Sequence, residues 1–299
     1  MISASWLWVV FTLLAAAGQT VRNAMQRELT AMLGTVGATH VRFLFGFPFA
    51  IVFLAVVLFA SSQALPQPGP MFWPWVLLGA FAQILATALM LAAMSDRSFV
   101  VTIAYIKTEA VQAAVFGLIF LGDAVTLPMV IAIFVATAGV VIMSLKGGGA
   151  ASGGLKPTLL GLVSGAAFAL SATGYRGAIL SLGHSNFVLA ATFTVTVGLV
   201  LQAVLLSLYL ALRQRAVLAA IARAWRPSLF AGLMGATASE FWFLAFALTS
   251  VANVRTLALV EVLFAQAISF FIFKQATTRR EALGMALIVV GVALLIWGV

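Results

Sequence analysis

The chain contains 299 residues, of which 64% are hydrophobic and only 8% are charged. Soluble globular domains carry about 25% charged residues, so this composition excludes that class and predicts a polytopic membrane protein. The absence of cysteine also excludes a disulfide scaffold, a thiolate metal site and a cysteine nucleophile.

Apolar runs of about 20 residues, the length that crosses a hydrocarbon layer of roughly 30 Å, predict an all-α protein with ten transmembrane helices. They cover residues 4–24, 37–60, 72–94, 99–121, 126–145, 158–181, 187–211, 227–248, 252–273 and 280–298. The breaks between them are short, and none leaves room for a soluble domain. The first run lacks the positive flank of a cleaved signal peptide, so we interpret it as a retained helix.

Positive charge is confined to alternate connections between these helices. The connections after the odd-numbered helices hold Arg27, Arg97, Lys146, Lys156, Arg213, Arg215, Arg223, Arg226, Lys274, Arg279 and Arg280. Because Lys and Arg in short loops stay on the cytoplasmic side, both termini are predicted to lie outside the cytoplasm of a bacterial inner membrane. Most of the net charge of +9 then comes from the loops on the predicted cytoplasmic side, and it favours contact with membrane lipid over nucleic acid.

A weak internal repeat relates the two halves of the chain. A shift of 152 residues pairs Glu109 with Glu261 and Gly139 with Gly291, and a shift of 154 pairs Arg22 with Arg176. We therefore predict two five-helix repeats, 1–146 and 158–299, joined by a Gly-rich linker at 147–157. Because five is odd, the second repeat enters the membrane in the opposite direction, an arrangement typical of secondary transporters.

The first predicted helix carries a polar face. Gln19, Arg22, Asn23 and Gln26 have the spacing of one helical side, and polar groups in a bilayer are costly unless they are paired or hydrated. For Gln19 and Asn23 we favour a cavity or an interhelical contact. For Arg22 and Gln26 the headgroup region is an equally good alternative, and His40 with Arg42 is interpreted as an interfacial pair.

Acidic residues lie in the middle of the fourth and ninth predicted helices. Lys107 lies on nearly the opposite side of its helix from Glu109, so it should meet a different neighbour. Structural ion pairs are one interpretation of these charges, and a hydrated cavity for a zwitterionic or mixed-charge solute is the other. The candidate substrate-binding residues are Glu109, Glu261, Glu240, Lys107, Tyr105, Gln83, Asn23 and Trp242.

Small residues predict close helix packing. Gly161 and Gly165 form one small pair, and Ala132 with Gly139 corresponds to Gly284 with Gly291. The fifth helix of each half could act as a brace, or the same faces could form a dimer, so either a monomer or a weak homodimer is expected. No catalytic, metal-binding or nucleotide-binding motif is present, and we expect neither enzyme activity nor a cofactor.

The pattern resembles the EamA type of the drug/metabolite transporter superfamily. The resemblance covers the whole chain and is carried by Phe120-Leu121-Gly122-Asp123 and by Gly139 and Gly291. In the second half, Phe271-Ile272-Phe273-Lys274-Gln275 departs from the signature. The resemblance implies efflux by alternating access, with helices 1–4 and 6–9 around a cavity and helices 5 and 10 as braces.

These observations lead to one leading hypothesis and one competitor. The leading hypothesis is an inner-membrane exporter of small metabolites. Aromatic or neutral amino acids are the best single substrate class, since some family members that resemble this chain export them. The competitor is an intramembrane enzyme or flippase acting on a lipid-linked substrate. Acid and base groups clustered at one membrane interface, and not at the middle of the helices, would favour the enzyme.

Overall fold

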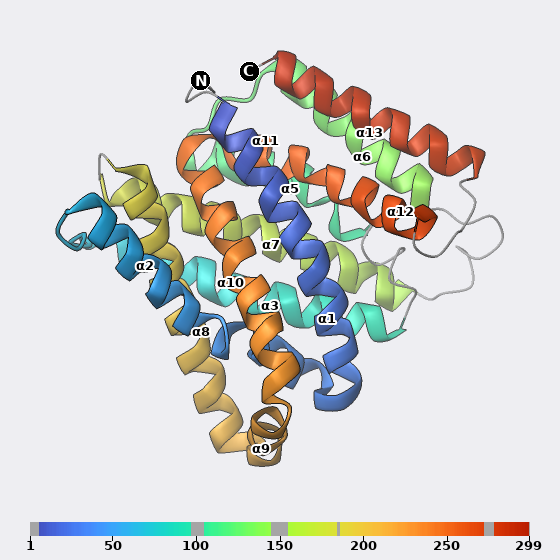
Figure 1. Ribbon diagram of the computed structural model, residues 1–299. Helices are drawn as coiled ribbons and strands as arrows, with labels where there is room; N and C mark the ends of the chain where they lie inside the picture. The colour runs from blue at the N-terminus through green and yellow to red at the C-terminus, as the bar shows by residue number, and fades with distance from the viewer. Residues whose placement is uncertain (1–5, 97–104, 145–154, 184–185, 272–277, 299) are drawn as a thin grey trace.

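The computed structural model describes residues 6–96, 105–144, 155–183, 186–271 and 278–298, and all regular structure within them is helical (Figure 1). In chain order the helices are α1 Leu7–Leu44, α2 Phe47–Ser61, α3 Phe72–Asp96, α5 Glu109–Phe116, the π-helix η2 Gly117–Leu121, α6 Leu127–Ser144, α7 Leu155–Ser181, α8 Phe187–Arg213, α9 Arg215–Arg223, α10 Trp225–Leu248, α11 Val251–Leu257, the 3-10 helix η3 Ala258–Val260, α12 Glu261–Phe271 and α13 Arg279–Trp297. The linker at 147–157 lies mostly outside the described residues.

Several helices could cross a membrane. Among the described residues, five segments are long and apolar enough to do so: Met25–Ser61, Phe72–Ala93, Phe187–Arg213, Trp225–Leu248 and Arg279–Trp297. Their outward faces carry large apolar side chains, such as Phe59 at 90% and Phe81 of α3 at 55% exposure. Exposed apolar surface on this scale is typical of proteins whose outer surface contacts membrane lipid.

The first two predicted helices are divided differently in the structure. α1 runs beyond the predicted end at residue 24 and kinks at Gly34, whose φ of 68° suits a residue without Cβ. Gln26 bridges this kink, because its Nε2 donates to the carbonyl of Ala38 at 3.1 Å. α2 then begins at Phe47, with Pro48 in its first turn, where the missing N–H costs no hydrogen bond.

The basic connection predicted at 213–227 is itself helical. α9, residues Arg215–Arg223, buries Ile221 and leaves Arg215 and Arg223 exposed. A short helix with one apolar and one basic side is typical of segments that lie along a membrane surface.

The fourth and ninth predicted helices, 99–121 and 252–273, are interrupted where continuous helices were expected. A turn at Lys107 and Thr108 precedes α5, which begins at Glu109. In the second half, the 3-10 segment η3 separates α11 from α12, which begins at Glu261. Each interruption thus ends at the glutamate that lay in the middle of the predicted helix.

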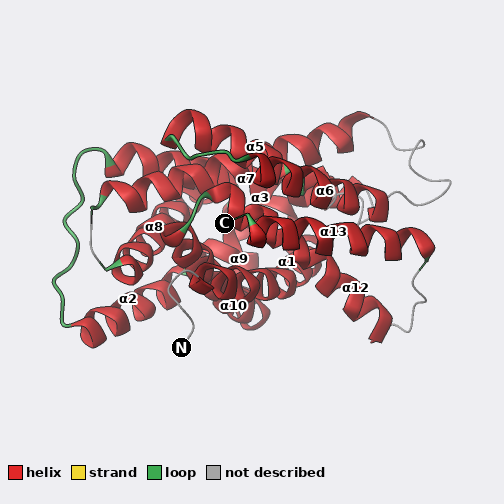
Figure 2. Ribbon diagram, turned by 90° about the horizontal axis from the view of Figure 1, so that it is seen from above, coloured by secondary structure: helices red, strands yellow, loops and turns green. Residues whose placement is uncertain are grey.

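Three helix pairs make the most extensive contacts: α1 with α10, α3 with α7, and α6 with α13. α6 and α13 lie side by side in both views (Figures 1 and 2). A Cβ added to Gly139 would lie 2.6 Å from the carbonyl oxygen of Gly284, and a Cβ on Gly284 would lie 2.6 Å from that of Gly139. The small faces predicted as a brace or a dimer contact are therefore occupied by one another within the chain.

Candidate functional site

A cavity lined mainly by polar side chains lies where α1, α3, α7 and the two interrupted helices meet; the space between its lining atoms, including the part open to solvent, is about 300 Å³. Its lining contains five charged groups, two amides and three apolar side chains: Glu109, Glu261, Lys107, Arg22, Arg255, Gln19, Asn23, Met90, Ile106 and Phe168. Charged side chains are rare within membrane helices, and they concentrate where a cavity or a partner compensates their desolvation.

Glu261 is the most heavily bonded carboxylate in the cavity. Its Oε2 lies 2.5 Å from Lys107 Nζ, and both side chains are almost fully buried. Gln19 Nε2 donates to the same oxygen at 3.1 Å, and Asn23 Nδ2 donates to Oε1 at 3.3 Å. The polar face of α1 therefore holds Glu261 from one side while Lys107 neutralises it from the other.

Glu109 has a more distant partner. Arg255 Nη1 lies 3.7 Å from Glu109 Oε1, close enough for electrostatic attraction but longer than a hydrogen bond. Lys107 thus pairs with Glu261 and Arg255 pairs with Glu109, so each ion pair joins a residue before position 145 to one after position 154. Lys107 therefore meets a neighbour other than Glu109, as its position on the opposite side of the helix predicted.

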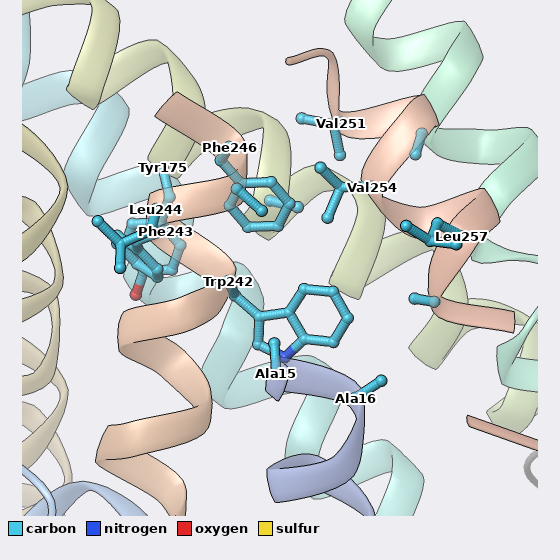
Figure 3. Packing of buried hydrophobic residues seen from close by; sticks show 14 of the residues in the cluster. Ala15, Ala16, Tyr175, Trp242, Phe243, Leu244, Phe246, Val251, Val254 and Leu257 are labelled. Carbon is cyan, nitrogen blue, oxygen red and sulfur yellow. The ribbon is translucent and has the colours of Figure 1, made fainter. Parts of the chain in front are cut away.

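Trp242 holds two of the lining residues in place. Its indole projects from α10 toward Ala15 and Ala16 of α1 and the side chains of α11 (Figure 3). The indole Nε1 donates to Gln19 Oε1 at 3.0 Å, and the guanidinium of Arg255 lies 4.8 Å from the ring centroid. Trp242 is 3% exposed and does not line the cavity, so it acts through Gln19 and Arg255.

The helix interruptions determine where the two glutamates point. As first residues of α5 and α12, they lie at helix N-termini, where the helix dipole favours a negative charge. Two glycines of α7 make room for the first interruption: a Cβ on Gly161 would lie 2.7 Å from Tyr105 Cβ, and one on Gly165 would lie 2.8 Å from the Ile106 carbonyl oxygen. The glycine pair noticed in the sequence thus supports the shape of the site.

Arg22 lines the cavity, and within the described ranges no carboxylate lies at ion-pair distance from it. Its Nη2 donates to Asn23 Oδ1 at 2.9 Å, while Nε and Nη1 are buried and form no hydrogen bond. Arg42, expected at the interface, is instead 2% exposed; its Nη1 donates to Thr87 Oγ1 at 3.2 Å and its Nε has no partner. A Cβ on Gly235 would lie 3.4 Å from both arginine side chains, so the two are neighbours.

Gln83 and Tyr105 lie outside the lining of the cavity. Gln83 Oε1 accepts hydrogen bonds from Gln202 Nε2 at 2.8 Å and Tyr175 Oη at 3.3 Å, which ties α3, α7 and α8 together. Tyr105 packs against Gly161 beside the first helix interruption. Both residues are therefore connected with helix packing and only indirectly with the cavity.

Glu240 is also outside the lining. Thr192 of α8 donates a hydrogen bond to Glu240 Oε1 at 2.5 Å, and the buried Oε2 has no partner. Four of the eight predicted site residues therefore line the cavity: Glu109, Glu261, Lys107 and Asn23. Sequence reasoning did not include Arg22 and Arg255 among the binding residues. Their position within predicted membrane helices, where charged residues are rare, could have indicated them.

Arg176 and Asp123 form a second polar cluster. Arg176 Nη1 donates to the carbonyl oxygens of Phe246 and Thr249 at the end of α10, and Nη2 lies 3.3 Å from Asp123 Oδ1. Gly122, with φ of 66°, ends η2 and directs the chain into Asp123. The Phe-Leu-Gly-Asp signature therefore ends in an ion pair that connects η2, α7 and the end of α10.

The site contains no metal-binding group in the parts of the chain described here, since no cluster of three or more His, Asp or Glu side chains suits a metal ion. What the cavity offers is charge. Two carboxylates, three cations and two amides line it, and these groups could exchange their present partners for the charged groups of a small solute.

Comparison with known proteins identifies the fold. No family model matches the chain, and no curated protein matches it either. One solved protein crystal structure is similar over 99% of this chain and 99% of its own, with a TM-score of 0.71 and 16% sequence identity. At that identity, the similarity shows that the two chains share a fold along their entire length.

Proposed function

We propose that this chain is a secondary transporter of the EamA type that exports small metabolites across the bacterial inner membrane by alternating access. Amino acids are the leading class of substrate. The observation that carries the proposal is the pair of interrupted helices: the glutamates that follow the two interruptions, Glu109 and Glu261, line the same cavity. Interrupted helices facing a shared central site are a recurring device of transporters.

The helix contacts support the inverted repeat that belongs to this proposal. If residues 1–146 and 158–299 are equivalent, α1 corresponds to α7 and α3 corresponds to α10. The contact of α1 with α10 is then the counterpart of the contact of α3 with α7, and the α6 and α13 pair is its own counterpart. The two counterpart contacts are similarly extensive, and this similarity is what a two-fold relation between the halves predicts.

The crossed ion pairs suggest how a solute could be coupled to movement. Lys107 and Arg255 each neutralise a carboxylate from the other half of the chain. A charged solute in the cavity competes for these groups, so its binding changes the contacts that hold the two halves together. Binding energy is thereby available to shift the equilibrium between two arrangements of the halves.

Counterflow into proteoliposomes tests the proposal. Vesicles preloaded with a mixed amino-acid pool should accumulate an external labelled substrate without an imposed gradient, and phenylalanine, tryptophan, methionine and threonine form the first panel. Glu109→Gln and Glu261→Gln should each lose accumulation, because each leaves a cavity cation without its carboxylate. Glu28→Gln, an equivalent change at an exposed position of α1, is the matched control.

Two outcomes would contradict the proposal. Wild-type rates in both cavity variants would show that the glutamates take no part in transport. Absence of counterflow for amino acids and other small metabolites, with protein that remains folded, would favour a lipid-linked substrate and the flippase or enzyme interpretation.

A further inference from the structure

The charges lining the cavity do not balance. Glu109 and Glu261 contribute two negative charges, and Lys107, Arg255 and Arg22 contribute three positive charges. Lys107 and Arg255 lie at ion-pair distance from a carboxylate, whereas among the described residues no carboxylate lies at that distance from Arg22. With all five groups ionised, the empty cavity therefore carries an excess positive charge at Arg22.

The environment of Arg22 leaves its binding capacity unused. The residue is 1% exposed, and its only hydrogen bond from the guanidinium in the described structure goes to the amide oxygen of Asn23. Nε and Nη1 are buried without a partner. A guanidinium offers five donors in a planar fork that matches a carboxylate, so the free edge of Arg22 is suited to one.

Arg42 increases the excess of positive charge. It lies beside Arg22 across Gly235, and within the described residues no carboxylate is within ion-pair distance of either guanidinium. Burial of a charge without an opposite charge costs several kcal/mol, even after the surroundings relax. An anion that enters the cavity balances this charge, so its binding removes part of the unfavourable free energy of the buried arginines.

We propose that the cavity binds a small organic solute with a net charge of −1, whose carboxylate is held by Arg22. The inference rests on the proposed function for transport, but binding can be measured without it. Lys107 and Arg255 already lie opposite glutamates, so one net negative charge on the solute is enough to balance the cavity. Met90, Ile106 and Phe168 complete the lining and provide contact for the apolar part of the solute.

This inference narrows the substrate class. A neutral zwitterionic amino acid leaves the cavity with its excess positive charge, and its ammonium must compete with Lys107 or Arg255 for a glutamate. A cationic solute adds to the excess. An acidic amino acid or a monocarboxylate without an ammonium group balances the charge, so these two kinds of solute should bind best.

Matched pairs of solutes that differ by one charge provide the test. We would compare glutamate with glutamine, aspartate with asparagine, and 3-phenylpropionate with phenylalanine. Two readouts are recorded for each: the increase in melting temperature of the detergent-solubilised protein, which reports binding, and counterflow in proteoliposomes, which reports transport. The anionic member of a pair should bind at least about tenfold more tightly than its neutral partner.

Three variants connect the preference to Arg22. Arg22→Gln should lose the preference for the anion by at least about tenfold, and Arg22→Lys should retain part of it. Arg223→Gln, the same change at an exposed position of α9, should leave it unchanged. Because Arg22→Gln removes an unpaired buried charge, its melting temperature without ligand should equal or exceed that of the wild type, whereas loss of a purely structural arginine would lower it.

Each outcome separates this inference from the proposed function. Equal binding and transport of acids and amides by the wild type would overturn the inference and leave the transporter proposal intact. An unchanged anion preference in Arg22→Gln would also overturn it. Stabilisation by the anions without counterflow would support the binding site and contradict the transporter, and absence of both responses would contradict both. If Arg22→Gln does not fold, the wild-type comparison and Arg22→Lys still decide the matter.

Discussion

Lys107 and Glu261 are separated by 154 positions in the sequence, yet their charged atoms lie 2.5 Å apart at the wall of the cavity. Both side chains are almost fully buried, so each depends on the other for neutralisation. Breaking a buried pair by removing one partner costs about 3–5 kcal/mol, whereas replacing both partners costs much less.

The first prediction follows from this pair. Lys107→Met and Glu261→Gln should each lower the free energy of unfolding by about 3 kcal/mol, and the double variant should lie closer to the wild type than either single variant. Denaturant titration in detergent micelles measures all three. Additive losses in the double variant would show that the pair contributes no coupling energy.

A second prediction concerns the contact of α6 with α13. Gly139→Ala and Gly284→Ala each place a Cβ 2.6 Å from a backbone oxygen of the facing helix, which forces the helices apart. Overpacking of this kind costs about 1–3 kcal/mol, so both melting temperatures should fall. Gly69→Ala, where an added Cβ meets nothing within 4 Å, is the matched control and should behave like the wild type. Unchanged stability in Gly139→Ala would mean that the contact is looser than described.

Trp242 leads to a third prediction. Trp242→Phe keeps an aromatic face for Arg255 but loses the hydrogen bond to Gln19, at a cost of about 1 kcal/mol. Trp242→Leu also loses the cation–π contact, which is worth about 2 kcal/mol when it is shielded from water. Stability should therefore decrease in the order Trp, Phe, Leu. The same two substitutions at Trp73, which is 45% exposed, should have small effects, and equal effects at both sites would contradict the assigned role.

The proposed orientation in the membrane gives a fourth prediction. Because the chain contains no cysteine, single substitutions can be labelled without background. Gln67→Cys, in the exposed connection between α2 and α3, should react with an impermeant maleimide from outside intact cells. Ala216→Cys, exposed on the basic helix α9, should react only after the cells are opened. The reverse pattern would invert the orientation inferred from loop charge.

Much of the helix organisation was predictable because it depends on local apolar length. The predicted segments at 72–94, 126–145 and 280–298 agree closely with α3, α6 and α13. The interruptions were not predictable from the sequence around them. Lys107-Thr108-Glu109 contains neither glycine nor proline, and the turn depends on room made by Gly161 and Gly165 of α7.

The composition of the cavity was only partly predictable for a similar reason. Periodicity places Gln19, Arg22 and Asn23 on one face of α1, and the structure directs that face into the cavity. Which carboxylate meets which cation depends on how distant helices pack, and residue spacing along one helix carries no such information. Glu240 shows the limit of that approach, since it lies within a helix as Glu261 does but meets Thr192 of α8.

The crossed ion pairs of the cavity have a kinetic consequence under the proposed function. Both pairs connect the two halves of the chain, so an empty molecule must break them in order to change its state. A bound solute that competes for the same charges lowers this barrier, and the loaded molecule then switches faster than the empty one. Flux should consequently be fastest when solute is present on both sides of the membrane, and exchange should outpace net efflux.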